Sequence, residues 1–312
     1  MIFKDRRVLV TGGAGVIGQE LLQRLILAGA HVTCMDVKPR PPSFPESVEY
    51  IQGDLSTTSP EMIAFHDPEI LFHLAATFER TTETPEFGDD NFKNNIQLSH
   101  SVLKAAGQSK NLKKLIFASS YLVYSPDQYL SAEPIIDPPI LSETGPINPR
   151  NLIGAAKYYT ENEMEYQNRI TDHFSIISAR IFRVYGKGSK DIVSRWIRAA
   201  LHGEELCVYN KKNQFDYIYA GDVAEGLFRM AASVNKNTVC NLGYGSTRRV
   251  EEVVAILKDQ FPDITVRDDG SKAPYENSCA GIERLTALTG WRPGISLKQG
   301  IQNVIDYETG QP

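Results

Sequence analysis

Cysteine and long apolar runs are scarce in this chain, and each shortage excludes a class of protein. The four cysteines, Cys34, Cys207, Cys240 and Cys279, stand far apart and form no Cys-x-x-Cys pair. We therefore expect reduced, buried thiols rather than disulfides or a cysteine-ligated metal. No apolar run reaches the roughly 20 residues that a membrane helix needs, and the N-terminus lacks a signal peptide's apolar core and cleavage site. The sequence thus predicts a cytoplasmic protein without a membrane partner.

Signals for several other functions are missing too. The formal net charge is −5 and no basic run occurs, which predicts no nucleic-acid partner. The six histidines form no His-Glu-x-x-His motif, and no Gly-x-Ser-x-Gly elbow is present, so neither a zinc protease nor an α/β-hydrolase is indicated. We predict no metal site, and we interpret His73, at the end of an apolar run, as structural.

What the chain does have is a regular alternation of strand-like and helix-like segments. Its 312 residues, 42% of them hydrophobic, suffice for one large core with a smaller lobe beside it. Strands are predicted at residues 7–10, 31–36, 48–52, 70–74, 115–119 and 174–179, and helices at 16–28, near 60, at 94–106 and at 152–168. This alternation predicts the α/β class, with a Rossmann-type doubly wound parallel sheet.

The pattern changes beyond about residue 184. Scattered helices are predicted at 192–201, 223–230, 250–260 and 297–307, with short strands at 206–209 and 238–242 and Pro-rich surface loops earlier, at 39–45 and 125–149. We expect residues 1–183 to form the sheet domain and residues 184–312 a smaller mixed α/β lobe that binds substrate, with the chain free to cross between them. Asp222 is expected to cap the helix that follows it.

A glycine-rich turn joins the first predicted strand to the first predicted helix. Gly12 and Gly15 stand where the backbone must come close to a pyrophosphate at a helix N-terminus, and Gly18 lets that helix pack tightly on the strand. Glycines also mark ordinary turns, so the trio alone is weak. Its position between a strand and a helix favours a dinucleotide site.

The second predicted strand ends in an acidic residue that strengthens this interpretation. Asp36 follows Gly18 by 18 residues, where a carboxylate can accept hydrogen bonds from both ribose hydroxyls. The same charge repels a 2′-phosphate, so NAD is favoured over NADP. The nearby cations Lys38 and Arg40 argue in the other direction.

Further motifs occur in the same order as in the extended short-chain dehydrogenase/reductases, and the chain resembles that family. Its members include sugar-nucleotide epimerases and dehydratases of the UDP-galactose 4-epimerase type. The likeness covers nearly the whole chain. The matching segments are Thr11-Gly12-x-x-Gly15-x-x-Gly18, Gly53-Asp54-Leu55, His73-Leu74-Ala75-Ala76, Asn95, Ser119-Ser120-x-x-Val123-Tyr124, Arg180-Ile181-Phe182-Arg183-Val184-Tyr185-Gly186, Asp216-Tyr217-Ile218-Tyr219-x-x-Asp222 and Gly290-Trp291-Arg292-Pro293.

The resemblance implies a set of NAD contacts. Asp54 and Leu55 would hold the adenine, and Lys157 would bind the nicotinamide ribose. Ala75 and Ala76 would line the groove, although these two and Leu55 can equally be core residues. The implied cofactor-binding residues are Gly12, Gly15, Val16, Ile17, Gly18, Asp36, Val37, Asp54, Leu55, Leu74, Ala75, Ala76, Asn95, Ser119, Lys157 and Phe182.

The catalytic set implied by the resemblance is incomplete. In the family a Ser or Thr, a Tyr and a Lys cooperate, and the tyrosine, as phenolate, takes the proton from a sugar hydroxyl while hydride leaves the same carbon. Ser120 and Lys157 are present, but the tyrosine position, four residues before the lysine on one helix face, is Ile153. Ala156 also replaces the usual serine. An isoleucine side chain cannot move a proton.

Tyr121 is the candidate substitute, because it adjoins Ser120 and a turn there can aim its hydroxyl into the cleft. The alternative is that it packs in the core, and a water held by Ser120 is another possible acceptor. Tyr158 and Tyr159 point off the face of the lysine. Dehydratases place an Asp-Glu pair at 121–122, where this chain has Tyr-Leu, so standard 4,6-dehydration is disfavoured.

The expected diphosphate contacts are missing as well. Family members carry an arginine where this chain has Phe215 and another in a stretch that here reads Asp-Gly-Ser-Lys-Ala-Pro, residues 269–274. The cations that can replace them, or simply be solvated surface charge, are Arg183, Lys187, Arg195 and Lys272.

Three hypotheses about function follow. The first is an NAD-dependent sugar-nucleotide-modifying enzyme with an atypical proton acceptor. The second is a catalytically idle NAD(H)-binding sensor or partner subunit, and the third an oxidoreductase acting on a non-nucleotide alcohol or ketone. The resemblance also implies a homodimer that pairs helices 94–106 and 152–168 through faces that include Ile96, Leu103, Tyr159 and Met164.

Overall fold

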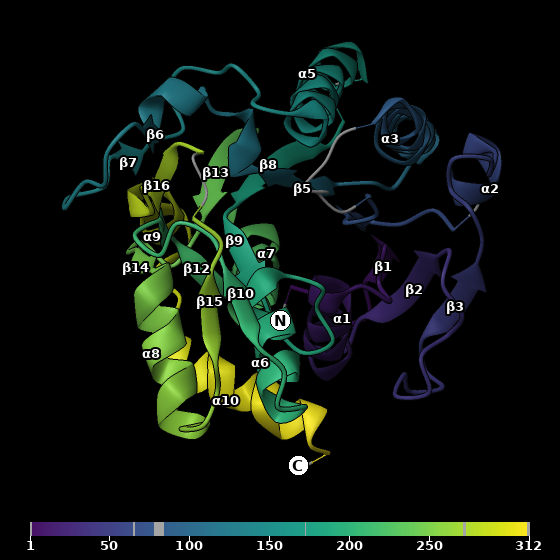
Figure 1. The fold of residues 1–312 in the computed structure, drawn as a ribbon. Coiled ribbons are helices and arrows are strands. Elements are labelled where there is room, and N and C mark those ends of the chain that lie inside the picture. Colours follow the sequence, from purple (N-terminus) through teal and green to yellow (C-terminus); the bar gives the residue numbers. More distant parts are fainter. Residues whose placement is uncertain (1, 65, 78–83, 172, 271–272, 311–312) are drawn as a thin grey trace.

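The computed structural model describes residues 2–64, 66–77, 84–171, 173–270 and 273–310. Its centre is a parallel sheet of seven strands in the order β13-β8-β5-β4-β1-β2-β3 (Figure 1). The strands are β1 (Arg7–Thr11), β2 (His31–Asp36), β3 (Glu49–Gln52), β4 (Ile70–His73), β5 (Lys114–Ser120), β8 (Ser175–Ile181) and β13 (Thr238–Leu242). The direction of winding reverses between β1 and β4, and such a switch point opens a crevice at the carboxyl ends of the strands.

Helices cover both faces of the sheet, which explains why its strands are apolar throughout. On β1, Val8 and Val10 face the core shared with α1 (Val16–Leu27) and α7 (Ala220–Ser233). Leu9, between them, faces the core shared with α4 (Leu98–Gln108) and α5 (Leu152–Thr171). The doubly wound fold that the sequence predicts is confirmed.

The helix predicted at 94–106 is longer and less regular than expected. It is preceded by α3 (Pro85–Asn91) and by a π-helical segment, Phe92–Gln97, before α4 begins. The helix near residue 60, α2 (Pro60–Ala64), packs on α4. Thr84 caps α3, its hydroxyl accepting a hydrogen bond from the backbone N–H of Phe87.

The smaller lobe has its own core, built where α6, α8 and α10 meet. In Figure 1 these helices lie together, apart from α3 and α5. Short strands from the middle of the chain, β6 and β7, pair with β16 and tie the lobe to the sheet domain. The remaining strands and α-helices are β6 (Leu130–Ser131), β7 (Ile140–Leu141), β9 (Arg183–Tyr185), α6 (Ile192–Leu201), β10 (Leu206–Val208), β11 (Gln214–Phe215), β12 (Tyr217–Tyr219), β14 (Arg248–Arg249), α8 (Val250–Gln260), β15 (Val266–Asp268), β16 (Tyr275–Ala280), α9 (Glu283–Thr289) and α10 (Leu297–Glu308).

Two predicted placements are wrong. Residues 238–242, predicted in the smaller lobe, form β13 and pair with β8 at the edge of the main sheet, because a short apolar run does not reveal which sheet it joins. The segment 125–149, predicted to be a plain surface loop, contains β6 and β7. The chain therefore returns to the sheet domain after residue 184.

Asp222 does not cap α7. The N-cap residue is Tyr219, and the Asp222 carboxylate instead accepts hydrogen bonds from the backbone N–H groups of Gly294 (2.9 Å) and Ile295 (2.8 Å). It therefore anchors the segment that leads into α10, and burial raises its pKa. The capping prediction is wrong because the tail, distant in sequence, provides the donors.

All four cysteines are free; Cys34, Cys240 and Cys279 are buried, as predicted, whereas Cys207 is half-buried. No helix in the described part of the chain combines the length and apolar character needed to cross a membrane. Among the same residues, no three His, Cys, Asp or Glu side chains are grouped to hold a metal ion.

Candidate active site

The turn after β1 can be made only by glycine. Gly12 has φ +73°, and a Cβ there would lie 2.6 Å from the backbone N of Ala75. A Cβ at Gly18 would lie 2.5 Å from the Cα of Gly13, so α1 rests directly on the turn. No side chain caps α1 at Gly15, which leaves the N–H groups of its first turn available to an anion.

A cavity of about 390 Å³ lies over this turn, at the carboxyl ends of the strands. The sequence-predicted residues that line it are Gly12, Gly15, Asp36, Val37, Asp54, Leu55, Leu74, Ala75 and Ala76. The wall also includes Lys38, Gly53, Thr77, Asn94 and Leu98, which sequence reasoning did not assign. Val16, Ile17 and Gly18, also predicted to contact the cofactor, form the first turn of α1 and are not among the residues that line this cavity.

The Asp36 carboxylate is held in place at the end of β2. One oxygen accepts from the N–H of Ala14 and the other from the N–H of Lys38, both at 2.9 Å. The guanidinium of Arg40 donates to the carbonyls of Val48 (2.9 Å) and Pro45 (2.7 Å). Arg40 is thus engaged with its own loop, and the fixed negative charge suits the ribose of NAD.

Asp54 also lies on this wall as a fixed charge. One of its oxygens accepts from the N–H (2.9 Å) and hydroxyl (2.6 Å) of Ser56, and the other pairs with Lys93 Nζ at 3.0 Å. These contacts, that of the Ser56 hydroxyl first, lower the pKa of Asp54. Lys93, from the π-helical segment, carried no signal in the sequence that linked it to Asp54.

Two residues predicted to contact the cofactor lie behind the wall instead. The Ser119 hydroxyl donates to Glu161 Oε1 at 2.5 Å, and Ser119 is buried. Asn95 accepts from the N–H of Thr77 at 2.9 Å and donates to Asn91 at 2.7 Å. Both residues therefore hold the segments that carry the wall. Successive residues of a strand point to opposite faces of the sheet, so Ser119 points away from the cavity that its neighbour Ser120 lines.

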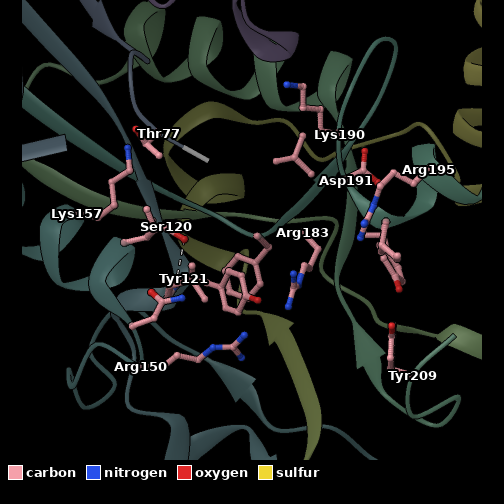
Figure 2. Close-up of a pocket in the computed structure, with 17 residues that line it drawn as sticks. Thr77, Ser120, Tyr121, Arg150, Lys157, Arg183, Lys190, Asp191, Arg195 and Tyr209 are labelled. Carbon is pink, nitrogen blue, oxygen red and sulfur yellow. Dashed lines mark hydrogen bonds between the residues drawn. The ribbon is translucent and has the colours of Figure 1, made fainter. Parts of the chain in front are cut away.

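A larger cavity, of about 700 Å³, opens beside the first. Thr77 lines both cavities, so they meet there. Four predicted residues, Ser120, Tyr121, Lys157 and Phe182, line the larger one (Figure 2).

Lys157 and Ile153 are placed by tight packing of α5 on the turn after β5. A Cβ at Gly154 would lie 2.3 Å from the carbonyl oxygen of Leu122, so only glycine allows this approach. Ile153 is 5% exposed and lies on the cavity wall one helical turn before Lys157. No hydroxyl replaces the family tyrosine on this helix face.

The Lys157 amine is buried, and this environment changes its chemistry. Its Nζ lies 4.8 Å from the centre of the Phe117 ring. Burial lowers the pKa of Lys157 to about 8, with the nearby charge of Glu161 opposing the shift. A lysine with this pKa exists in both protonation states at physiological pH.

Tyr121 both lines the cavity and packs in the core, the two placements that the sequence left open. It lines the cavity, yet it is 3% exposed and its ring stacks on Phe182 with centroids 5.1 Å apart. Its hydroxyl donates to Glu276 Oε1 at 2.7 Å. The guanidinium groups of Arg150 (2.5 Å) and Arg183 (3.3 Å) form ion pairs with the other oxygen of Glu276. Burial alone would raise the pKa of Glu276, but these two cations outweigh it and keep the pKa below its usual value.

The larger cavity is rich in cations. Arg183 and Arg195, two of the predicted replacements for the missing arginines, line it, and so do Arg150 and Lys190, which sequence reasoning missed. Lys187 is exposed and not part of its wall, and Lys272 lies outside the described residues. Arg150 stands three residues before Ile153, the tyrosine position, and this proximity was the one sequence feature that could have indicated a place in the active site.

These two joined cavities can be compared with known proteins. The model of the NAD dependent epimerase/dehydratase family matches residues 8–243. The chain belongs to this family. The resemblance and the cofactor prediction, NAD, are thereby confirmed.

Relatives within the NAD dependent epimerase/dehydratase family align along the whole chain. A Methanocaldococcus jannaschii protein provisionally named UDP-glucose 4-epimerase is 29% identical over 316 residues, covering 96% of this chain and 97% of the relative. UDP-N-acetyl-alpha-D-glucosaminuronate decarboxylase of Bacillus cytotoxicus is 25% identical, with 97% of each chain covered. The structure of MoeE5 in complex with UDP-glucuronic acid and NAD has a TM-score of 0.85 at 25% identity, covering 97% of this chain and 99% of that one.

Proposed function

We propose that this family member is an NAD-dependent enzyme that modifies a nucleotide sugar by transient or net hydride transfer at a sugar carbinol. The observation that carries the proposal is the junction of the two cavities at Thr77, beside Ser120 and Lys157. A sugar in the larger cavity would meet the cofactor groove there. The names of the relatives and the ligands of MoeE5 support a nucleotide sugar as substrate.

The Lys157 amine is the group best suited to replace the missing tyrosine as proton acceptor. NAD, when bound, supplies the hydride acceptor. Ser120 lies on the same cavity wall, where its hydroxyl can hydrogen-bond the sugar hydroxyl, and the proton of the sugar hydroxyl passes to the neutral amine. The amine then becomes an ammonium as the carbinol becomes a carbonyl. A pKa of about 8 makes the neutral amine available near physiological pH.

Tyr121 is less suited to this role. Its O–H already donates to Glu276, so accepting a second proton would require passing the first to that carboxylate. Arg183 and Arg150 hold Glu276 ionised and make it a weak base. We therefore assign Tyr121 to the wall of the cavity.

One observation favours a second candidate function. Ile153 leaves the tyrosine position without any acid or base, which suits an NAD(H)-binding sensor or partner subunit without turnover. This candidate predicts cofactor binding and no reduction of NAD by any sugar.

Nucleoside diphosphates should stabilise the protein if the substrate is a nucleotide sugar. We expect UDP, GDP or dTDP, added to the NAD complex at about 100 times its Kd, to contribute about 2.7 kcal/mol and to raise Tm by several degrees. Differential scanning fluorimetry measures this shift, with the nucleosides uridine, guanosine and thymidine as matched controls that lack the diphosphate. Equal Tm values with all six compounds would contradict a nucleotide-sugar substrate and favour a simple alcohol or ketone.

We also propose a homodimer that forms through α4 and α5. Tyr159, Tyr166 and Ile170 of α5 are exposed apolar side chains, which supports such an interface. Leu103 and Met164, predicted to face a partner, are buried in the core of their own chain.

A further inference from the structure

A buried ion pair lies behind the wall of the active site. Glu161 and Arg180 have side chains that are 6% and 5% exposed. Arg180 binds the carboxylate through two nitrogens, with Nε 3.1 Å from Oε1 and the second nitrogen 2.7 Å from Oε2. This bidentate geometry joins the Glu161 carboxylate to the Arg180 guanidinium by two charge-assisted hydrogen bonds.

The ion pair adjoins both retained catalytic residues. Glu161 follows Lys157 by four residues on α5, so the two side chains are neighbours on one helix face. Its Oε1 also accepts the Ser119 hydroxyl at 2.5 Å. Ser119 precedes Ser120 at the end of β5. One carboxylate is thus linked to the strand that carries Ser120 and to the helix that carries Lys157.

The other groups around Lys157 leave Glu161 as its counter-charge among the described residues. From β4, His73 bonds Thr11 (2.8 Å) and Ser99 (3.0 Å), and burial, followed by the charge of Lys157, lowers its pKa to about 3, so it is neutral. From β5, Phe117 presents its ring. From β8, Arg180 carries a positive charge that is paired with Glu161.

We propose that Glu161 is a positioning residue for this active site: through Ser119 it fixes the end of β5, and it holds a negative charge one helical turn from the Lys157 amine. The proposal rests on the proposed role of Lys157. Accepting a proton creates an ammonium in a desolvated site, which is costly without a nearby anion. Glu161 supplies that anion, and its bidentate ion pair with Arg180 holds the carboxylate in place.

The test follows the titration of Lys157 itself, in the NAD-free protein and without any substrate. The protein is labelled with 13Cε-lysine, and the Lys157 signal is assigned by its loss in Lys157→Arg. We expect a midpoint near pH 8 in the wild type and, in Glu161→Gln, a midpoint lower by about one pH unit, because the counter-charge is gone. Glu161→Asp, which keeps the charge, should titrate close to the wild type.

Glu165→Gln is the matched control, because Glu165 is an exposed carboxylate one turn further along α5. It should leave the Lys157 midpoint unchanged. An unchanged midpoint in Glu161→Gln, or an equal shift in Glu165→Gln, would overturn the proposal.

If Glu161→Gln fails to fold, the double variant Glu161→Gln/Arg180→Gln removes both members of the ion pair, so that Arg180 is not left unpaired, and a smaller downward shift is expected. The absence of a downward shift in the double variant would overturn the proposal equally. The titration measures no turnover. An inactive protein would therefore still show whether Glu161 affects the Lys157 midpoint, and an unchanged midpoint would not decide whether the protein is active.

Discussion

Replacing Lys157 by methionine is expected to reduce hydride transfer by about 10²- to 10⁴-fold, the range contributed by a positioned general base. The methionine keeps most of the side-chain volume beside the Phe117 ring, so the fold should persist. Single-turnover NADH absorbance measures the loss. The NAD Kd, measured by fluorescence in parallel, should change far less than the rate.

Lys157→Arg separates a proton acceptor from a fixed positive charge. Arginine keeps the charge and the hydrogen-bond donors but remains protonated at all usable pH values. If Lys157 accepts the proton, the arginine variant should be as slow as the methionine variant. Substantial activity in Lys157→Arg would show that only the charge matters. A measurable reaction that Lys157→Met abolishes while NAD still binds would exclude the idle-protein hypothesis.

Replacing Glu276 by glutamine is expected to destabilise the protein by about 3–5 kcal/mol, the cost of breaking a buried ion pair by removing one partner. Glu276 is buried on β16, with 5% of its surface exposed. One of its oxygens accepts hydrogen bonds from Tyr121 and Ser278, and the other pairs with Arg150 and Arg183. The neutral amide leaves two guanidinium groups close together without the shared carboxylate. Urea unfolding, with the midpoint and slope fitted together, measures the change.

Ser278→Ala is the control, because it removes only one neutral donor from Glu276, at 3.2 Å, and should cost about 1 kcal/mol. The pKa of Glu276 is lowered in the folded state, so its stabilisation is complete above the unfolded pKa and is lost as the pH falls through the folded one. The stability difference between wild type and Glu276→Gln should therefore shrink in acid. A difference that is small at pH 7, or independent of pH, would contradict this account of the cluster.

The parts of the fold that follow simple periodicity could be predicted from the sequence. β2, α6 and α8 begin and end where the apolar pattern predicts, because each buries one face or both faces of a regular element. The cofactor groove was also predictable. Gly12 acts through the backbone geometry of the turn after β1 and Asp36 through its charge at the end of β2, and both belong to one strand–helix–strand motif.

The substrate side could not be predicted in the same way. β16 carries Glu276, Asn277 and Ser278, which are polar but buried. The strand therefore has no apolar run from which it could be predicted. Glu276 becomes important only because Arg150 and Tyr121, each more than 100 residues away, bring their side chains to it. Glu161 likewise depends on Ser119 and Arg180, which only the folded sheet brings together with α5.

The proposed function makes Lys157 the proton acceptor in the oxidation of a sugar carbinol, although Ile153 replaces the family tyrosine. The most direct test is single-turnover reduction of protein-bound NAD, followed at 340 nm across a panel of nucleotide sugars between about pH 6 and pH 10. We predict NADH formation with at least one of them, at a rate that rises with pH and levels off above a midpoint near 8, the pKa of Lys157. Bound NAD that stays oxidised with every sugar, or a rate independent of pH over this range, would contradict the account.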